Sequence, residues 1–240
     1  MLILIPILFV ILAGCGIFAL RPIAEKITII FHSSPVINRL IKFQFLQLIL
    51  AIFFLCIVYF LNPGNFSTYF QAGNVDHKIS RINWLGVTGN ETWLEVALSI
   101  GIFISIGTAV FMFFQFKKAG VDYRYFPFSF LWAVPFSITN AFSEEAIFRL
   151  GIVSPLSGLL SVSVIVLISA VLFGVPHYFG MPSGVIGVIM AGFLGWLLAL
   201  SLVETQGLMI AWAIHFVQDV IIITSMILMS KKRSTAIISL

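Results

Sequence analysis

The chain has 240 residues, of which 60% are hydrophobic, 15% aromatic and only 9% charged, and its formal net charge at pH 7 is +4. Because soluble globular domains carry about 25% charged residues, this composition excludes a soluble enzyme, a nucleic-acid-binding protein and a disordered scaffold. Long runs almost free of charge recur along the chain. They predict an all-α fold, a polytopic transmembrane helical bundle for which the lipid bilayer is the main solvent.

Seven stretches are long and apolar enough to span a membrane, for which about 20 residues are needed. In chain order they cover residues 2–20, 40–61, 93–116, 128–156, 159–177, 183–203 and 208–230. Residues 21–38 mix charged side chains with Ile and Phe, and we expect here a helix lying at the inner membrane interface. Leu12-Ala13-Gly14-Cys15 is similar to a bacterial lipoprotein cleavage box, but no Lys or Arg precedes the apolar run, so we favour a retained span.

Basic residues cluster after the first, third and seventh of these stretches. The clusters are Arg21, Lys26, Arg39 and Lys42, then Lys117, Lys118 and Arg124, and finally Lys231, Lys232 and Arg233. Since basic residues mark the cytoplasmic segments of membrane proteins, this pattern predicts a multi-pass protein of the cell membrane, cytoplasmic or plasma. Its N-terminus would lie outside, its C-terminus in the cytoplasm, and the polar segment 62–92 would form an external loop.

A few ionisable residues lie on the predicted spans, where each costs about 2.5 to 3.5 kcal/mol on insertion scales and is therefore a functional candidate. They are Glu144, Glu145 and Arg149 on the fourth span, His177 at the end of the fifth, and His215 and Asp219 on the seventh. Such groups can satisfy one another only in the interior of the bundle. We therefore expect side chains from three spans to converge on one site.

The spacing of these residues predicts how they pair. Glu145 and Arg149 are four residues apart, the spacing at which an acid followed by a base forms its better ion pair on a helix. Glu144 lies about 100° away around the same helix and has no such partner, so it is free to accept a proton. His215 and Asp219 are also four residues apart and project from one helix face.

The depth of the site follows from the position of the expected helical hairpin. Breaker residues at 154–158 place its turn near residue 158. With a rise of about 1.5 Å per residue, Glu144 then lies about 21 Å and His177 about 28 Å from the outer end. Gly174 and Pro176 loosen the helix just before His177 and let its side chain approach a cavity. The site should lie between the middle of the membrane and its cytoplasmic face.

At these residues the sequence resembles the CAAX protease and bacteriocin-processing family, also called the Abi family, of glutamic intramembrane endopeptidases. The three family motifs are Glu-Glu-x-x-x-Arg, Phe-x-x-x-His, and His-x-x-x-Asn or Asp. They read here Glu144 to Arg149, Phe173 to His177, and His215 to Asp219. The resemblance divides the chain into family-variable N-terminal spans and loops at 1–124, a catalytic core at 125–230 and a cytoplasmic tail at 231–240.

The resemblance also implies catalytic roles. Glu144 would activate a water together with His177, while His215 and Asp219 would face the carbonyl oxygen of the substrate. The last position is commonly Asn, whose amide can donate to an oxyanion, whereas an ionised Asp219 cannot. We expect that Asp219 is either protonated or orients His215 as the donor.

Three further motif residues are expected in supporting roles. Glu145 with Arg149 would hold the helix and its charge in place, and Phe173 opens the motif that ends at His177. The expected activity is hydrolysis of a peptide bond in a membrane-associated protein or peptide, with the bilayer as the other partner. We expect no cofactor, no metal ion and no nucleic-acid partner, and the sequence does not indicate an oligomeric state.

Three alternatives stay open. Two histidines and three carboxylates could hold a divalent ion in a metal-dependent protease, although the His-Glu-x-x-His motif is absent from the sequence. A proton-coupled transporter uses similar residues, but the sequence shows no inverted repeat. A bacteriocin immunity protein or other peptide-binding membrane protein would need no catalysis.

Overall fold

The computed structural model describes residues 4–231, apart from several side chains near the start of the first helix. Lys232 and Arg233 of the third basic cluster, and the rest of the expected tail, lie outside the described residues. The elements in chain order are α1 (Leu4–Lys26), α2 (Pro35–Leu61), α3 (Pro63–Tyr69), η1 (Asn83–Leu85), α4 (Trp93–Ala119), η2 (Tyr123–Tyr125), α5 (Phe126–Glu145), η3 (Ala146–Leu150), α6 (Gly151–Leu156), α7 (Val162–Gly174), η4 (Val175–Phe179), α8 (Gly184–Thr205) and α9 (Met209–Met229). Within this part of the chain every element is helical, which confirms the predicted all-α fold.

Five of the helices in the described range are long and apolar enough to cross a membrane: α2, α4, α7 together with η4, α8 and α9. The other two predicted spans correspond to α1 and to the rod formed by α5, η3 and α6, which covers 126–156 without a break. The number of about seven spans is therefore approximate, because five helices meet the criteria by length and composition.

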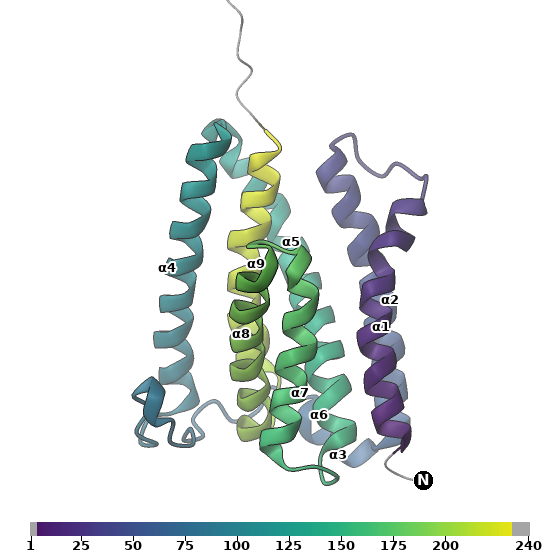
Figure 1. Ribbon diagram of the computed structural model, residues 1–240, viewed down its shortest axis with the longest axis vertical. Helices are drawn as coiled ribbons and strands as arrows, with labels where there is room; N and C mark the ends of the chain where they lie inside the picture. The colour runs from purple at the N-terminus through teal and green to yellow at the C-terminus, as the bar shows by residue number, and fades with distance from the viewer. Residues whose placement is uncertain (1–3, 232–240) are drawn as a thin grey trace, which may run out of the picture.

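The central pair of the bundle is α5 and α9, which pack closely against each other. On one side α4 lies against α9, and on the other α2 covers α5 while α1 covers α2 (Figure 1). The hairpin of α7 and α8 packs on α9 and on η3. Its upper turn lies well below the upper ends of α4 and α9 (Figure 1).

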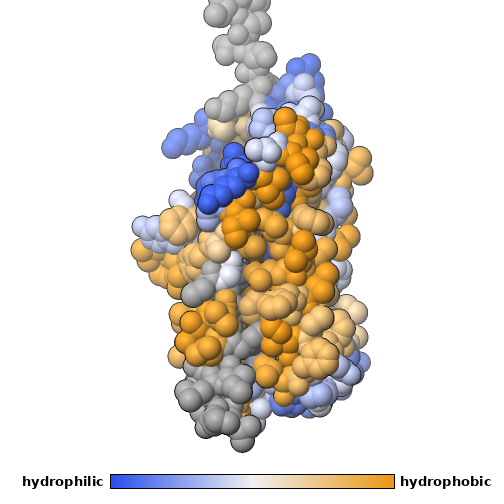
Figure 2. Space-filling view, turned by 90° about the vertical axis from the view of Figure 1, so that its right-hand side faces the viewer, coloured by the Kyte–Doolittle hydropathy of each residue, from blue (hydrophilic) through white to orange (hydrophobic). Residues whose placement is uncertain are grey.

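The outer surface of the bundle is apolar. Figure 2 shows the face formed by α1 and α2 as largely hydrophobic, with hydrophilic residues gathered toward its two ends. Large side chains such as Phe60 on α2 and Phe103 on α4 are exposed by 80% and 78%. Such a continuous apolar surface suits lipid and not water. The protein is thus a multi-pass membrane protein.

Residues 21–38 do not form the expected interfacial helix, and that prediction is wrong. α1 continues into this stretch, where Arg21 Nε and Glu25 Oε1 lie 3.3 Å apart one turn from each other. α2 begins at Pro35, a residue whose fixed φ suits the first turn of a helix. The connection is short, and Lys42 Nζ donates to the carbonyl of Ile27 at 2.6 Å.

The polar segment between α2 and α4 is folded onto the lower end of the bundle. Trp93 is fully buried, and its indole Nε1 donates to Glu204 on α8 at 2.8 Å. Residues 70–74 run along the turn between α8 and α9, where Leu208 N donates to Gln71 O at 2.7 Å. This loop therefore ties the lower ends of α4, α8 and α9 together.

Candidate active site

The backbone changes its helical form at the site. Glu144 and Glu145 end α5, and the chain then continues as η3, a π-helical segment in which Gly151 N donates to the carbonyl of Ala146 five residues back. All residues of η3 are buried. Such π-turns inside α-helices are rare and frequently occur at functional sites.

Glu145 and Arg149 form a fully buried ion pair, as their spacing predicts. Arg149 Nε lies 3.0 Å from Glu145 Oε2, and both side chains are 0% exposed. The guanidinium carbon of Arg149 lies 4.2 Å from the centre of the Phe173 ring, which provides a cation–π contact. Phe173 thereby covers the charge of this pair on the side of α7.

His215 makes its shortest polar contact with Glu145. Its Nδ1 lies 2.7 Å from Glu145 Oε1, whereas Nε2 lies 3.7 Å from Asp219 Oδ2 and 3.5 Å from Glu144 Oε2. A carboxylate paired with arginine accepts hydrogen bonds, so Nδ1 carries the proton in this contact. Glu145 lies closer to the imidazole than Asp219 does, a contact between helices that the spacing within α9 could not predict.

Glu144 is held through one of its two oxygens. Oε1 accepts hydrogen bonds from Gln47 Nε2 on α2 at 3.1 Å and from Asn140 Nδ2 on α5 at 3.2 Å. Among the described residues, Oε2 has no hydrogen-bond partner and faces His215 Nε2. Arg149 pairs with Glu145 and not with Glu144 among the described residues, so one oxygen of Glu144 has neither a cation nor a hydrogen-bond donor of its own.

Asp219 shares a hydrogen-bond donor with Glu144. Asn140 Nδ2 donates to Asp219 Oδ2 at 3.0 Å as well as to Glu144. Asn140 therefore links a carboxylate of α5 to a carboxylate of α9, and the two acids lie within reach of one amide.

His177 lies on η4, directly after the close of α7. Its Nδ1 is 2.7 Å from the carbonyl of Phe173, and since a carbonyl can only accept, Nδ1 carries the proton. The neutral ring then keeps an unprotonated Nε2. In the described part of the chain no hydrogen bond joins His177 directly to Glu144, so cooperation between them would need a molecule between them.

A cavity of about 310 Å³ opens beside these residues between α4, η4, α8 and α9. His177, His215 and Asp219 contribute its ionisable groups, and Thr108 and Gln218 add two further polar side chains. Glu144 lies behind His215 and is not itself among the lining residues. The remaining walls are mostly apolar and include Phe103, Phe111, Met190, Phe193 and Leu194. An apolar cavity with a few convergent polar groups is the usual form of a ligand site.

Three polar residues of the site were missed from the sequence. Asn140 precedes Glu144 by four residues, so helical spacing could have found it, and Gln47 is an amide inside an otherwise apolar span. Gln218, next to Asp219, accepts from Thr108 Oγ1 at 2.8 Å and donates to Ser105 Oγ at 2.7 Å, which joins α9 to α4.

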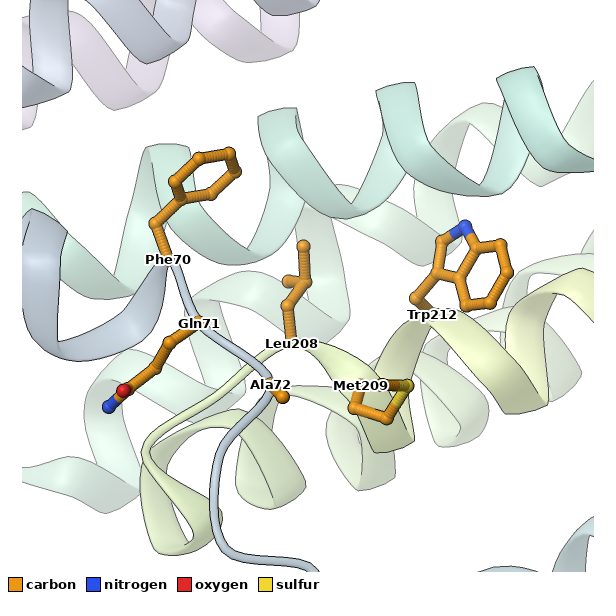
Figure 3. Close-up of a pocket in the computed structure, with 6 residues that line it drawn as sticks. All are labelled: Phe70, Gln71, Ala72, Leu208, Met209 and Trp212. Carbon is orange, nitrogen blue, oxygen red and sulfur yellow. The ribbon is translucent and has the colours of Figure 1, made fainter.

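Elsewhere in the described residues, neither a second pocket nor a metal-ligand group offers comparable chemistry. A surface pocket at the lower end is lined by Phe70, Gln71, Ala72, Leu208, Met209 and Trp212, and Figure 3 shows that no ionisable side chain is among them. Over residues 4–231, no group of three or more His, Cys, Asp or Glu side chains is arranged to hold a metal ion. The cluster of ionisable side chains around Glu144 is therefore the candidate active site of the described structure.

Comparison with known proteins supports the resemblance. The family model described as type II CAAX prenyl endopeptidase Rce1-like matches residues 126–221. This segment is less than half of the chain, and it contains all three motifs and the whole ionisable cluster. The match confirms the resemblance to the CAAX protease family. No curated protein and no solved structure matches the chain.

Proposed function

We propose, since residues 126–221 match the family model described as type II CAAX prenyl endopeptidase Rce1-like, that the protein is a glutamate-dependent intramembrane endopeptidase. It hydrolyses a peptide bond of a membrane-associated protein or peptide with a water activated by Glu144 and His177. The observation that carries this proposal is the meeting of carboxylates and imidazoles from three membrane-embedded segments beside an apolar cavity.

The first step needs a base for water. Glu144 suits this task because two amides occupy Oε1, whereas Oε2 keeps free lone pairs. His177 lines the cavity with Nε2 unprotonated, so this nitrogen can hold the same water in place. Glu144 takes a proton from the water as the water oxygen attacks the carbonyl carbon, and later returns this proton to the leaving amine.

The second requirement is a donor for the oxyanion of the tetrahedral intermediate. His215 is anchored through Nδ1 to Glu145, and in its protonated form Nε2 can donate toward the cavity. Asp219 can add a second donor when it carries a proton.

The charge of the buried cluster supports this protonation scheme. With three ionised carboxylates (−3) and one guanidinium (+1), the cluster carries −2 while both histidines are neutral. Uncompensated buried charge is costly. One proton on His215 and one on Asp219 bring the charge to zero and leave Glu144 ionised. We propose this as the resting state, which corresponds to the alternative in which Asp219 is protonated.

The cavity indicates the kind of substrate. Its aromatic and aliphatic walls on α4 and α8 suit an apolar or lipid-modified segment, while its ionisable groups lie on α9 and η4. The matched family model is described as type II CAAX prenyl endopeptidase Rce1-like. We propose that this protein likewise takes a substrate held at the membrane.

We propose further that the protein lies in the cell membrane with its C-terminus in the cytoplasm. α1 and α4 end, and α9 reaches Lys231, at the same upper end of the bundle (Figure 1). Asp122 N donates to Lys231 O at 3.1 Å, so the second and third basic clusters adjoin each other. Basic residues gathered at one end favour the cytoplasmic side.

Peptidomics of cells that contain either the wild-type protein or Glu144→Gln tests the function and identifies the substrate. Peptides produced by the wild type should disappear in Glu144→Gln and in His177→Ala, because each variant removes one of the groups that hold the water. Both variants must remain folded, as shown by monodisperse elution in detergent. Glu25→Gln, at the exposed upper end of α1, serves as the control with unchanged cleavage. Near-normal turnover by purified Glu144→Gln would refute the proposal.

A further inference from the structure

α2 contributes directly to the site although it lies outside the matched segment. Gln47 on α2 is only 1% exposed, and its Nε2 donates to Glu144 Oε1 at 3.1 Å across 97 residues of sequence. α2 also packs along α5 and η3, the elements that carry the motif acids. The N-terminal helices are therefore part of the surroundings of the catalytic carboxylate.

Two amides hold the same oxygen from different helices. Gln47 approaches Glu144 Oε1 from α2, and Asn140 approaches it along α5. The last torsion of a glutamate side chain is broad and roughly two-fold, so one donor alone would allow the two oxygens to exchange. Two donors from different directions fix Oε1 and leave Oε2 facing His215.

A purely structural role does not explain why α2 carries a buried amide at Gln47. Its Oε1 is buried without a hydrogen-bond partner among the described residues. A buried polar atom without a partner is unfavourable, and an apolar side chain of the same length would avoid this cost. The hydrogen bond to Glu144 is the one contact that an apolar replacement could not reproduce.

We propose that Gln47 is a positioning residue that selects Glu144 Oε2 as the base, so that α2 belongs to the catalytic machinery. The inference rests on the proposed function, since it assigns Glu144 the task of activating water. Gln44 provides a matched control because it lies one turn earlier on α2 and is 4% exposed. In the described structure it forms no hydrogen bond with Glu144.

The test compares purified full-length wild type, Gln47→Met and Gln44→Met on an internally quenched peptide with a farnesylated CAAX end. Gln47→Met should lower kcat by about 10- to 100-fold, the effect of losing a hydrogen bond to a charged group, and leave KM within about twofold. Its Tm should stay equal or rise, because an unpartnered buried oxygen is removed. Gln44→Met should leave kcat and KM unchanged.

A merely structural role gives the opposite pattern, a lower Tm with kcat per folded molecule unchanged, and this result would overturn the proposal. Gln47→Glu supplies a second variant of similar size and polarity. It must lower kcat as well, because it places an acceptor where Glu144 needs a donor. Wild-type kcat in Gln47→Glu would equally contradict the positioning role.

An infrared measurement separates this inference from the proposed function. The carboxyl band that is absent from Glu144→Gln identifies Glu144 in the wild type without any substrate. This band should shift in Gln47→Met and stay in place in Gln44→Met. An unshifted band would refute the positioning role even in an active enzyme, whereas a shifted band in a protein without peptidase activity would refute only the proposed function.

Discussion

Glu145 has a partner on each of its two oxygens in the interior of the bundle: Oε2 forms an ion pair with Arg149 Nε at 3.0 Å, and Oε1 accepts from His215 Nδ1 at 2.7 Å. It therefore connects the cation of η3 to the imidazole of α9. The same carboxylate holds the helix, compensates a buried charge and sets the orientation of a site residue. A substitution at Glu145 should affect stability and the orientation of His215 together.

We predict that Glu145→Gln destabilises the protein by about 3 to 5 kcal/mol, because it leaves the buried guanidinium of Arg149 without its counterion. Thermal unfolding in detergent measures this loss as a lower Tm. The double variant Glu145→Gln, Arg149→Met removes both charges and should recover much of the Tm. A double variant as unstable as the single one would show that the buried charge is not the cause.

We predict that Asp219→Asn remains active, whereas Asp219→Leu loses at least about 100-fold in kcat, the effect of removing one oxyanion donor. An asparagine amide can donate to the oxyanion and can still accept from Asn140 through its carbonyl. Steady-state cleavage assays of the two purified variants measure their kcat values. Equal activity of the Leu variant would contradict a donor role for Asp219.

The sequence predicts contacts within one helix better than contacts between helices. The pairing of Glu145 with Arg149 follows from four-residue spacing, and so could the contact of Asn140 with Glu144. Spacing carries no information about Gln47, which reaches Glu144 from a helix 97 residues away. Nor could it show that His215 turns toward Glu145, because that choice depends on how α5 and α9 pack.

At the scale of elements, the helical stretches were predictable and their internal form was not. Residues 128–156 were expected as one span, and the structure has a continuous rod at 126–156 that includes the π-helical η3 in its last third. An apolar run is compatible with an α-helix or a π-helix, because both satisfy the backbone N–H and C=O groups within the segment. The hairpin of α7 and α8 is close-packed, since a Cβ at Gly174 would lie 2.8 Å from Val188 O.

The turn between α8 and α9 depends on a close approach of two glycines. A Cβ added at Gly73 would lie 2.7 Å from Gly207 Cα, and a Cβ at Gly207 would overlap the backbone of Gly73. We predict that Gly207→Ala lowers the free energy of unfolding by about 1 to 3 kcal/mol through overpacking, measured by thermal unfolding in detergent.

Gly107→Ala is the matched control, since no atom lies within 4 Å of its added Cβ in the middle of α4. It should be neutral or stabilising by up to about 1 kcal/mol, because alanine favours the helix interior over glycine. Equal Tm values for Gly207→Ala and the wild type would contradict the close approach.

At the scale of the whole molecule, the composition predicts the membrane as solvent and the basic clusters predict the orientation. We predict that Asn90→Cys, in the segment between η1 and α4, reacts with an impermeant maleimide on intact cells. Lys118→Cys, at the end of α4, should react only after lysis, because Lys117, Arg124 and Lys231 favour the cytoplasmic side for this end.

Both cysteines are introduced in a variant in which Cys15 and Cys56 are replaced, so that labelling reports the new thiols alone. Labelling of position 118 on intact cells, with position 90 protected, would reverse the proposed orientation. Labelling of both on intact cells would place them on one side and contradict the crossing by α4.

The low upper turn of the α7–α8 hairpin has a consequence for the depth at which a substrate meets water. α7 with η4 and α8 are each long enough to cross the hydrocarbon, so the upper parts of α4 and α9 rise past the hairpin turn toward the headgroups (Figure 1). His177 on η4 lies just before this turn. We therefore expect a scissile bond to meet water at His177 close to the headgroup level, without descending to the middle of the bilayer.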